Sequence, residues 1–107
     1  MYDKNNVFAK ILRGEIPSNK IYEDNFVLAF HTIAPEAKVH ALVIPKGEFT
    51  DIYEFISNAD SDFQSGFWAG VRATVDKLNL MEFRTIANTG AVAGQSVFHF
   101  HIHIMAN

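Results

Sequence analysis

The sequence predicts an α+β fold: a five-stranded antiparallel sheet covered by two main helices. Three observations support this prediction. Five short apolar or alternating stretches are separated by turn residues, one longer stretch repeats apolar residues at helical spacing, and 107 residues can enclose only one core. With 49% hydrophobic residues, the chain can fill that core from its side chains alone. We therefore expect a single domain over residues 1–107.

The first predicted element is a helix over residues 7–12, where pairs of apolar residues recur at helical spacing. Asn5 or Asn6 can cap its start, and Gly14 can end it in the left-handed conformation. Pro17 prevents the helix from continuing.

Strands are predicted over residues 20–22, 26–30, 39–44, 84–87 and 97–105. The first two flank Glu23, Asp24 and Asn25, a combination typical of a hairpin turn. The third is stopped by Pro45 and Gly47.

Two further helices are predicted between the third and fourth strands. A short one covers residues 51–56, and a longer one begins at a Ser61 cap. The longer helix carries an apolar stripe with steps of three and four residues, formed by Phe63, Phe67, Val71, Val75 and Leu78. Gly66 and Gly70 lie near this face. They indicate either close approach of another backbone or a tolerated loss of helix stability.

Composition excludes several classes of protein. Without cysteine there is no disulfide framework and no cysteine-based zinc site, and a net charge of −3 has the wrong sign for binding duplex nucleic acid. No apolar run approaches the length of a membrane span, and the first residues lack the pattern of a secretory signal. We therefore expect a soluble, cytoplasmic protein.

The most informative segment is the last one. Residues 85–107 contain no Asp, Glu, Lys or Arg, but hold three of the five histidines. As a strand, this segment would place His99, His101 and His103 on one face and Phe98, Phe100, Ile102 and Ile104 on the other. Such a row predicts a chemical site on one face and core packing on the other, although a solvated sheet face would give the same alternation.

A metal site is a more specific alternative explanation for the row of histidines, because histidine is the commonest metal ligand. Same-face neighbours on a strand are roughly 6.6 Å apart, so three in a row cannot converge on one ion. Two of them could chelate a metal with a third ligand from His40 or His31, but we expect no metal and no cofactor.

Divided roles suit the row better than metal binding. A neutral imidazole can attack phosphorus while a protonated neighbour gives a proton to the leaving group, both near neutral pH. The glycine-rich approach over residues 90–96 could present backbone N–H groups and the Ser96 hydroxyl to a phosphate.

The segment from His99 to Met105 resembles the His-φ-His-φ-His-φ-φ signature, where φ is apolar, of the histidine triad (HIT) family. The resemblance extends over nearly the whole chain, including the Gly14-Glu15-Ile16-Pro17 and Leu42-Val43-Ile44-Pro45-Lys46 segments. It implies nucleotidyl transfer or hydrolysis by a homodimer, and the apolar stripe of the long helix offers a physical hint of dimerisation.

The resemblance also implies residue roles. His101 corresponds to the nucleophile that attacks the α-phosphate and forms a nucleotidyl-histidine intermediate. His103 resembles the residue that contacts the phosphate and leaving group, and His99 and His40 resemble imidazoles that orient His101. Ser96 and the Val97 N–H match phosphate-binding positions, and the leaving group takes its proton from His103 or Ser96.

Asn88, Gly94 and Gln95, with the Ser96-Val97 pair, favour the Hint-like branch of purine nucleoside phosphoramidases over the dinucleoside polyphosphate hydrolases. The resemblance also implies a nucleoside pocket around Phe8, Ile11, Phe30 and Ile33, side chains that would equally suit plain core.

Two departures from the family pattern affect these expectations. Thr32 stands where the branch usually has an aspartate that bonds the ribose hydroxyls, which weakens ribose recognition. Asn6, Ala9 and Glu48 replace residues that bind structural zinc in some relatives, so no zinc site of that kind is expected.

The resulting expectation is a hydrolase or transferase of purine nucleoside monophosphate derivatives such as adenosine phosphoramidates, without a membrane or duplex nucleic-acid partner. The alternatives are a nucleotide-binding interaction module with little catalysis, a dinucleoside polyphosphate hydrolase, and a metal-dependent protein.

Overall fold

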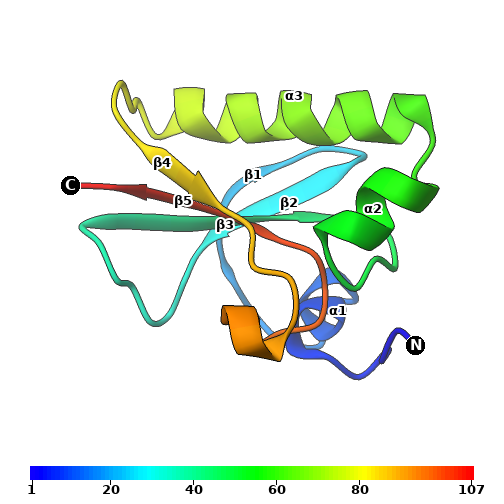
Figure 1. The fold of residues 1–107 in the computed structure, drawn as a ribbon. Helices are drawn as coiled ribbons and strands as arrows, with labels where there is room; N and C mark the ends of the chain where they lie inside the picture. The colour runs from blue at the N-terminus through cyan, green and yellow to red at the C-terminus, as the bar shows by residue number, and fades with distance from the viewer.

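The computed structural model describes all 107 residues and contains one five-stranded antiparallel sheet with the order β1-β2-β3-β5-β4 (Figure 1). The strands are β1 (Asn19–Glu23), β2 (Val27–His31), β3 (Val39–Pro45), β4 (Arg84–Ile86) and β5 (Ile102–Ala106). The helices are α1 (Val7–Leu12), α2 (Ile52–Asn58) and α3 (Ser61–Lys77), with a short 3₁₀ turn η1 (Ala91–Ala93). The predicted fold class is confirmed.

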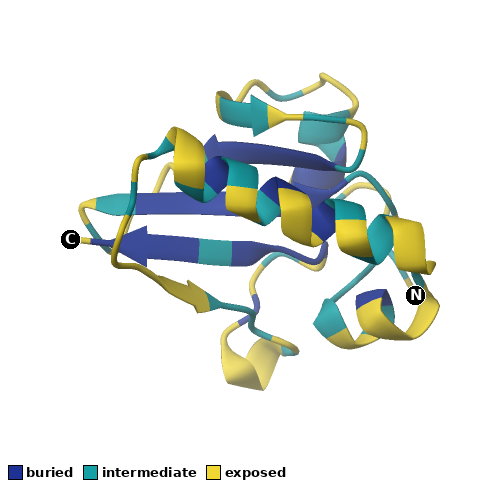
Figure 2. Ribbon diagram, turned by 90° about the horizontal axis from the view of Figure 1, so that it is seen from above, coloured by how far each residue is buried: buried dark blue, intermediate teal, exposed yellow.

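The sheet separates two apolar layers. Helix α3 lies across one face, and α1 and η1 lie on the other (Figures 1 and 2). Because side chains alternate along a strand, Val27 and Ala29 face α3, whereas Leu28 and Phe30 face α1. The sheet therefore has a closed face under α3 and a second face, beside α1, on which a site can form.

The N-terminal predictions hold in detail. The Asn6 side chain accepts a hydrogen bond from the Ala9 N–H at 2.9 Å, so Asn6 rather than Asn5 caps α1. Gly14 has a φ of +78°, the left-handed conformation that ends this segment. In the β1–β2 turn, the Asp24 carboxylate accepts from the backbone N–H groups of Phe26 and Val27.

The N-cap of helix α3 lies one residue before the predicted cap, and Ser61 is the first residue of the helix. Asp60, not Ser61, is the N-cap, and its carboxylate accepts from the Phe63 N–H at 2.8 Å. A carboxylate there also interacts favourably with the positive end of the helix dipole, an advantage that a serine hydroxyl lacks.

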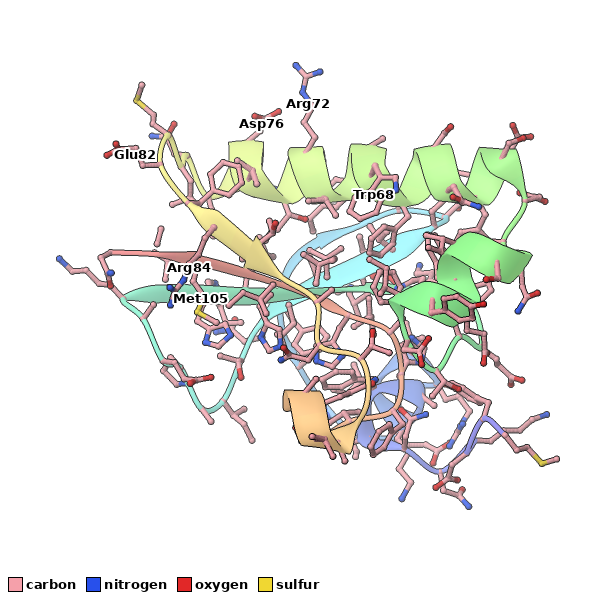
Figure 3. All side chains as sticks on the ribbon, viewed as in Figure 1. Trp68, Arg72, Asp76, Glu82, Arg84 and Met105 are labelled. Carbon is pink, nitrogen blue, oxygen red and sulfur yellow. The ribbon has the colours of Figure 1, made fainter.

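The apolar stripe of α3 packs on the protein's own sheet. Phe67 is fully buried, and a Cβ on Gly70 would overlap the Val27 side chain, so the glycine permits close approach. On the opposite side of α3, Arg72 and Asp76 point into solvent (Figure 3). Because its own core occupies the stripe, the stripe is no longer a hint of dimerisation.

The last strand is shorter than predicted. Pairing of β5 begins at Ile102 instead of Val97, and Phe98 is 40% exposed rather than part of the core. The reason lies on the neighbouring strand: β3 ends at Pro45, which has no N–H for a ladder, and the Phe100 N–H instead donates to the Phe49 carbonyl at 2.7 Å.

None of the helices combines the length and the apolar character that crossing a membrane would require.

Candidate active site

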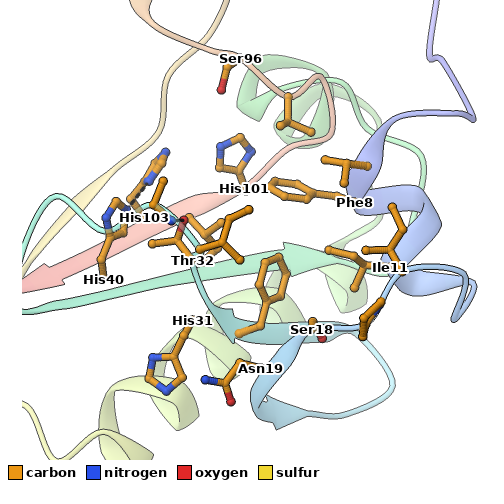
Figure 4. A pocket seen from close by; sticks show the side chains of 18 of the residues that line it. Phe8, Ile11, Ser18, Asn19, His31, Thr32, His40, Ser96, His101 and His103 are labelled. Carbon is orange, nitrogen blue, oxygen red and sulfur yellow. Dashed lines mark hydrogen bonds between the residues drawn. The ribbon is translucent and has the colours of Figure 1, made fainter.

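A cavity of about 620 Å³ opens on the α1 side of the sheet (Figure 4). Its walls come from α1, β2, β3 and the segment leading through β5. The predicted site residues that line it are Phe8, Ile11, Phe30, Thr32, Ile33, His40, Ser96, Val97, His101 and His103. The predicted residues that do not line it are Asn88, Gly94, Gln95 and His99.

His101 is held in one tautomer. Its Nδ1 lies 2.8 Å from the His99 carbonyl oxygen, and since a carbonyl only accepts, Nδ1 carries the proton. The neutral ring therefore has its lone pair on Nε2. Burial lowers the pKa of His101 below its usual value, which keeps the ring neutral near pH 7. Phe8 packs edge-on against the ring, with centroids 5.0 Å apart.

A second chain of hydrogen bonds fixes His103. The Glu36 N–H donates to Nδ1 of His40 at 3.0 Å, so a neutral His40 carries its proton on Nε2. That N–H donates to Nδ1 of His103 at 2.9 Å, which places the His103 proton on Nε2. His40 was expected to orient His101, but its ring bonds His103 because His40 and His103 lie on adjacent strands.

The environment of His103 also differs from the expected protonated neighbour. Burial, with smaller contributions from His101 and His40, lowers the pKa of His103 to about 4. In the free protein His103 is therefore a neutral hydrogen-bond donor near pH 7.

His99 serves the site through its backbone rather than its ring. The imidazole is 1% exposed; its Nε2–H donates to the Pro45 carbonyl at 2.9 Å, and its Nδ1 accepts from the Tyr2 hydroxyl at 2.6 Å. The expectation of an imidazole that orients His101 is corrected: the His99 carbonyl does this. Tyr2 belongs to no motif, and no signal in the sequence identified it.

The glycine-rich loop is shaped by Gln95. The buried Gln95 amide donates to the carbonyls of Thr50 and Val97, and its oxygen accepts from the Gly90 N–H. Gly94 has a φ of +100°, and the Asn88 side chain lies beside it. Gln95 and Gly94 thus hold the loop that presents Ser96 to the cavity. Neither these two residues nor Asn88 line the cavity themselves.

The far end of the cavity is the predicted nucleoside pocket. Phe30 is buried in its wall, whereas Ile33 is fully exposed and forms the rim. The Thr32 hydroxyl accepts from the Ala34 N–H at 3.3 Å. Sequence reasoning did not place nine other lining residues in the nucleotide site, although it named His31 as a possible metal ligand: Val7, Ile16, Pro17, Ser18, Asn19, His31, Ala34, Glu36 and Leu42. The predicted hairpin could have indicated one pair, since its register places Asn19 opposite His31 (Figure 4).

The donor set does not resemble a metal site. The facing nitrogens of His40 and His103 bond each other, the Asn6 side chain caps α1, and Ala9 offers no ligand atom. No group of three or more histidine, aspartate or glutamate side chains is arranged to hold an ion.

The buried histidines predict acid-sensitive stability. The pKa of His99 and of His103 is about 4 when folded, against about 6.5 in an unfolded chain, so the unfolded chain binds more protons between these values. Stability contributed by the neutral rings is complete above pH 6.5 and is lost as the pH falls toward 4. Thermal unfolding should show a clearly lower midpoint at pH 5.5 than at pH 7.5, a window in which most carboxylates stay ionised. Equal midpoints at these two values would contradict the assigned burial.

Known proteins match this sequence and fold. A family model described as HIT domain matches residues 13–107. An uncharacterised HIT-like protein of Rickettsia prowazekii is 45% identical over 107 residues, covering 98% of this chain and 89% of the relative. Among solved structures, a HIT family hydrolase from Clostridium thermocellum aligns with a TM-score of 0.88 at 34% identity, covering 98% of this chain and 92% of that one. A histidine triad protein from Clostridium difficile aligns with a TM-score of 0.86 at 37% identity, covering 100% and 94%. The chain therefore belongs to the histidine triad (HIT) family.

Proposed function

We propose that this protein is a Hint-like hydrolase or transferase that acts on the α-phosphate of purine nucleoside monophosphate derivatives, such as adenosine phosphoramidates. One observation supports this most strongly. The His99 carbonyl holds the proton of His101 on Nδ1, which leaves a neutral Nε2 lone pair on a ring that lines the cavity. The resemblance of the fold to a HIT family hydrolase supports the same reaction class.

In the proposed first step, His101 Nε2 bonds to phosphorus and the bond from phosphorus to the leaving amine breaks. The amine takes a proton and departs, and the nucleotide remains on the imidazole. In the second step water attacks phosphorus and loses one proton, which replaces the proton that the amine took, the bond to Nε2 breaks, and the nucleoside monophosphate leaves. An amine or alcohol in place of water would give the transferase reaction.

Ser96 and His103 line the cavity together with His101. In our proposal the His103 Nε2–H and the Ser96 hydroxyl donate to the phosphate oxygens and to the leaving group. A bound phosphate anion would raise the pKa of His103 from about 4, because it favours the charged imidazolium. The added proton would sit on Nδ1 of His103, so this change also requires His40 to stop donating to that nitrogen.

The base is proposed to lie between Phe8, Ile11 and Phe30, where the wall is apolar and aromatic. The sugar would lie near Thr32, whose single hydroxyl cannot bond both ribose hydroxyls as a carboxylate does. Recognition would then depend more on the base and the phosphate than on the ribose.

The test is turnover of an adenosine 5′-phosphoramidate, followed by chromatography of the released adenosine monophosphate. We expect catalytic turnover with a burst of released amine equal to the number of sites if the second step is slower than the first. Tight binding of the nucleotide without turnover would favour the alternative, an interaction module. Faster cleavage of a diadenosine polyphosphate would favour the other branch of the family.

We also propose that the protein is a homodimer. Strand β4 pairs only with β5, so its outer edge carries unpaired backbone groups, and Met81 and Phe83 just before it are exposed. Sedimentation at micromolar loading should give twice the monomer mass, and a monomer mass would refute the dimer.

A further inference from the structure

Tyr2 is the one residue outside the final segment and β3 that hydrogen-bonds the His99 ring. Its hydroxyl is 2.6 Å from Nδ1 of His99, and the two rings meet edge to face with centroids 5.7 Å apart. Because Nε2 of His99 donates to the Pro45 carbonyl, the neutral ring accepts at Nδ1, and the Tyr2 O–H is the donor. Tyr2 does not line the cavity.

Two hydrogen bonds connect Tyr2 to the reactive ring through His99. The Tyr2 hydroxyl donates to the His99 ring, and the His99 carbonyl accepts from Nδ1–H of His101. A third bond, from the His99 ring to the Pro45 carbonyl, anchors the other side of that ring. Both ring nitrogens of His99 are thereby satisfied at a side chain that is almost fully buried. Phe8 packs edge-on against both imidazoles, which limits other movements of the pair.

We propose that Tyr2 is a positioning residue for His101: by holding the His99 ring, it fixes the backbone carbonyl that keeps the His101 proton on Nδ1. This inference rests on the proposed function, in which Nε2 of His101 is the nucleophile. A free neutral imidazole favours the proton on Nε2, so the reactive tautomer needs a well-placed acceptor at Nδ1. Without the Tyr2 hydroxyl, Nδ1 of His99 becomes a buried acceptor without a donor, and rotation of residue 99 that relieves this also moves its carbonyl.

The test compares Tyr2→Phe with the wild type and with Tyr53→Phe. Phenylalanine keeps the aromatic packing and removes only the hydroxyl, and Tyr53 is a matched control because it is 71% exposed and lies on α2. With an adenosine phosphoramidate, Tyr2→Phe should lower kcat roughly tenfold, the effect of one misplaced hydrogen bond, and leave KM within about twofold. Tyr53→Phe should change neither value.

Nitrogen-15 spectra of the imidazoles provide a readout that a purely structural role would not change. In the wild type, His101 should show a protonated Nδ1 and an unprotonated Nε2 at neutral pH, and in Tyr2→Phe a mixture of the two tautomers. A variant that melts at lower temperature but keeps the wild-type kcat and the wild-type His101 spectrum would overturn the inference. If the wild type fails to turn over the substrate, the proposed function fails, and the spectra still decide whether Tyr2 controls the tautomer.

Discussion

Replacement of His101 with alanine is expected to lower turnover of an adenosine phosphoramidate by at least about 10³-fold, because it removes the atom that bonds phosphorus. The reasoning depends on geometry. His101 is the ring whose Nε2 lone pair is left free by a fixed Nδ1–H, and it lines the cavity together with Ser96 and His103. Neither of these neighbours can substitute for it, since a neutral serine is a weak nucleophile and the His103 proton is on Nε2.

The variant should still fold and still bind adenosine monophosphate, because the apolar nucleoside pocket is unchanged. His31→Ala is the matched control: it removes an imidazole at the opposite end of the same cavity (Figure 4), so it should change affinity modestly and kcat by less than about threefold. Steady-state kinetics and circular dichroism of the three proteins provide the measurement. A His101→Ala protein that retains most of its activity would refute the assigned role.

Replacement of Phe67 with alanine should give the largest loss of stability, about 3–5 kcal/mol, because it opens a cavity in the core under α3. Phe67 is fully buried, and its ring centroid lies 5.0 Å from those of both Phe55 and Phe100. These three rings connect α2, α3 and the segment before β5. The two neighbours of His101 in the sequence, Phe100 and Ile102, belong to the same core cluster, so the position of His101 depends on this packing. The thermal midpoint should fall by about 15 °C or more for a domain of this size.

Tyr53→Ala is the control for the loss of an aromatic side chain. Tyr53 is 71% exposed, and its replacement should cost less than about 1 kcal/mol. Urea unfolding of both variants with a common slope gives the comparison. Similar losses in the two proteins would show that the rings under α3 are not the main source of stability.

The fold was predictable from sequence wherever local signals and packing agree. The Asn6 cap, the Asp24 turn and the stripe of α3 each combine a favourable residue with an apolar face that must be covered, so the elements follow from short-range physics. The alternation of the final segment predicted a strand that starts too early, at Val97 instead of Ile102, because alternation does not reveal where a strand loses its partner. That limit is set by Pro45 on another strand.

The site was predictable in its residues but not in its connections. The histidine row identified His101 and His103 as cavity residues, yet which imidazole bonds which depends on register between β3 and β5. The role of His99 was missed because it acts through a carbonyl, a group that every residue has. Tyr2 was missed because its contact spans 97 positions of sequence.

The most direct test of the account is a search for the nucleotidyl-histidine intermediate. The protein is mixed with an adenosine phosphoramidate, quenched within milliseconds at alkaline pH to preserve the phosphorus–nitrogen bond, digested and analysed by mass spectrometry. We predict an adenylyl group on His101 of the wild type and none in His101→Ala. Turnover without any such adduct, or an adduct on a different residue, would contradict the proposed mechanism.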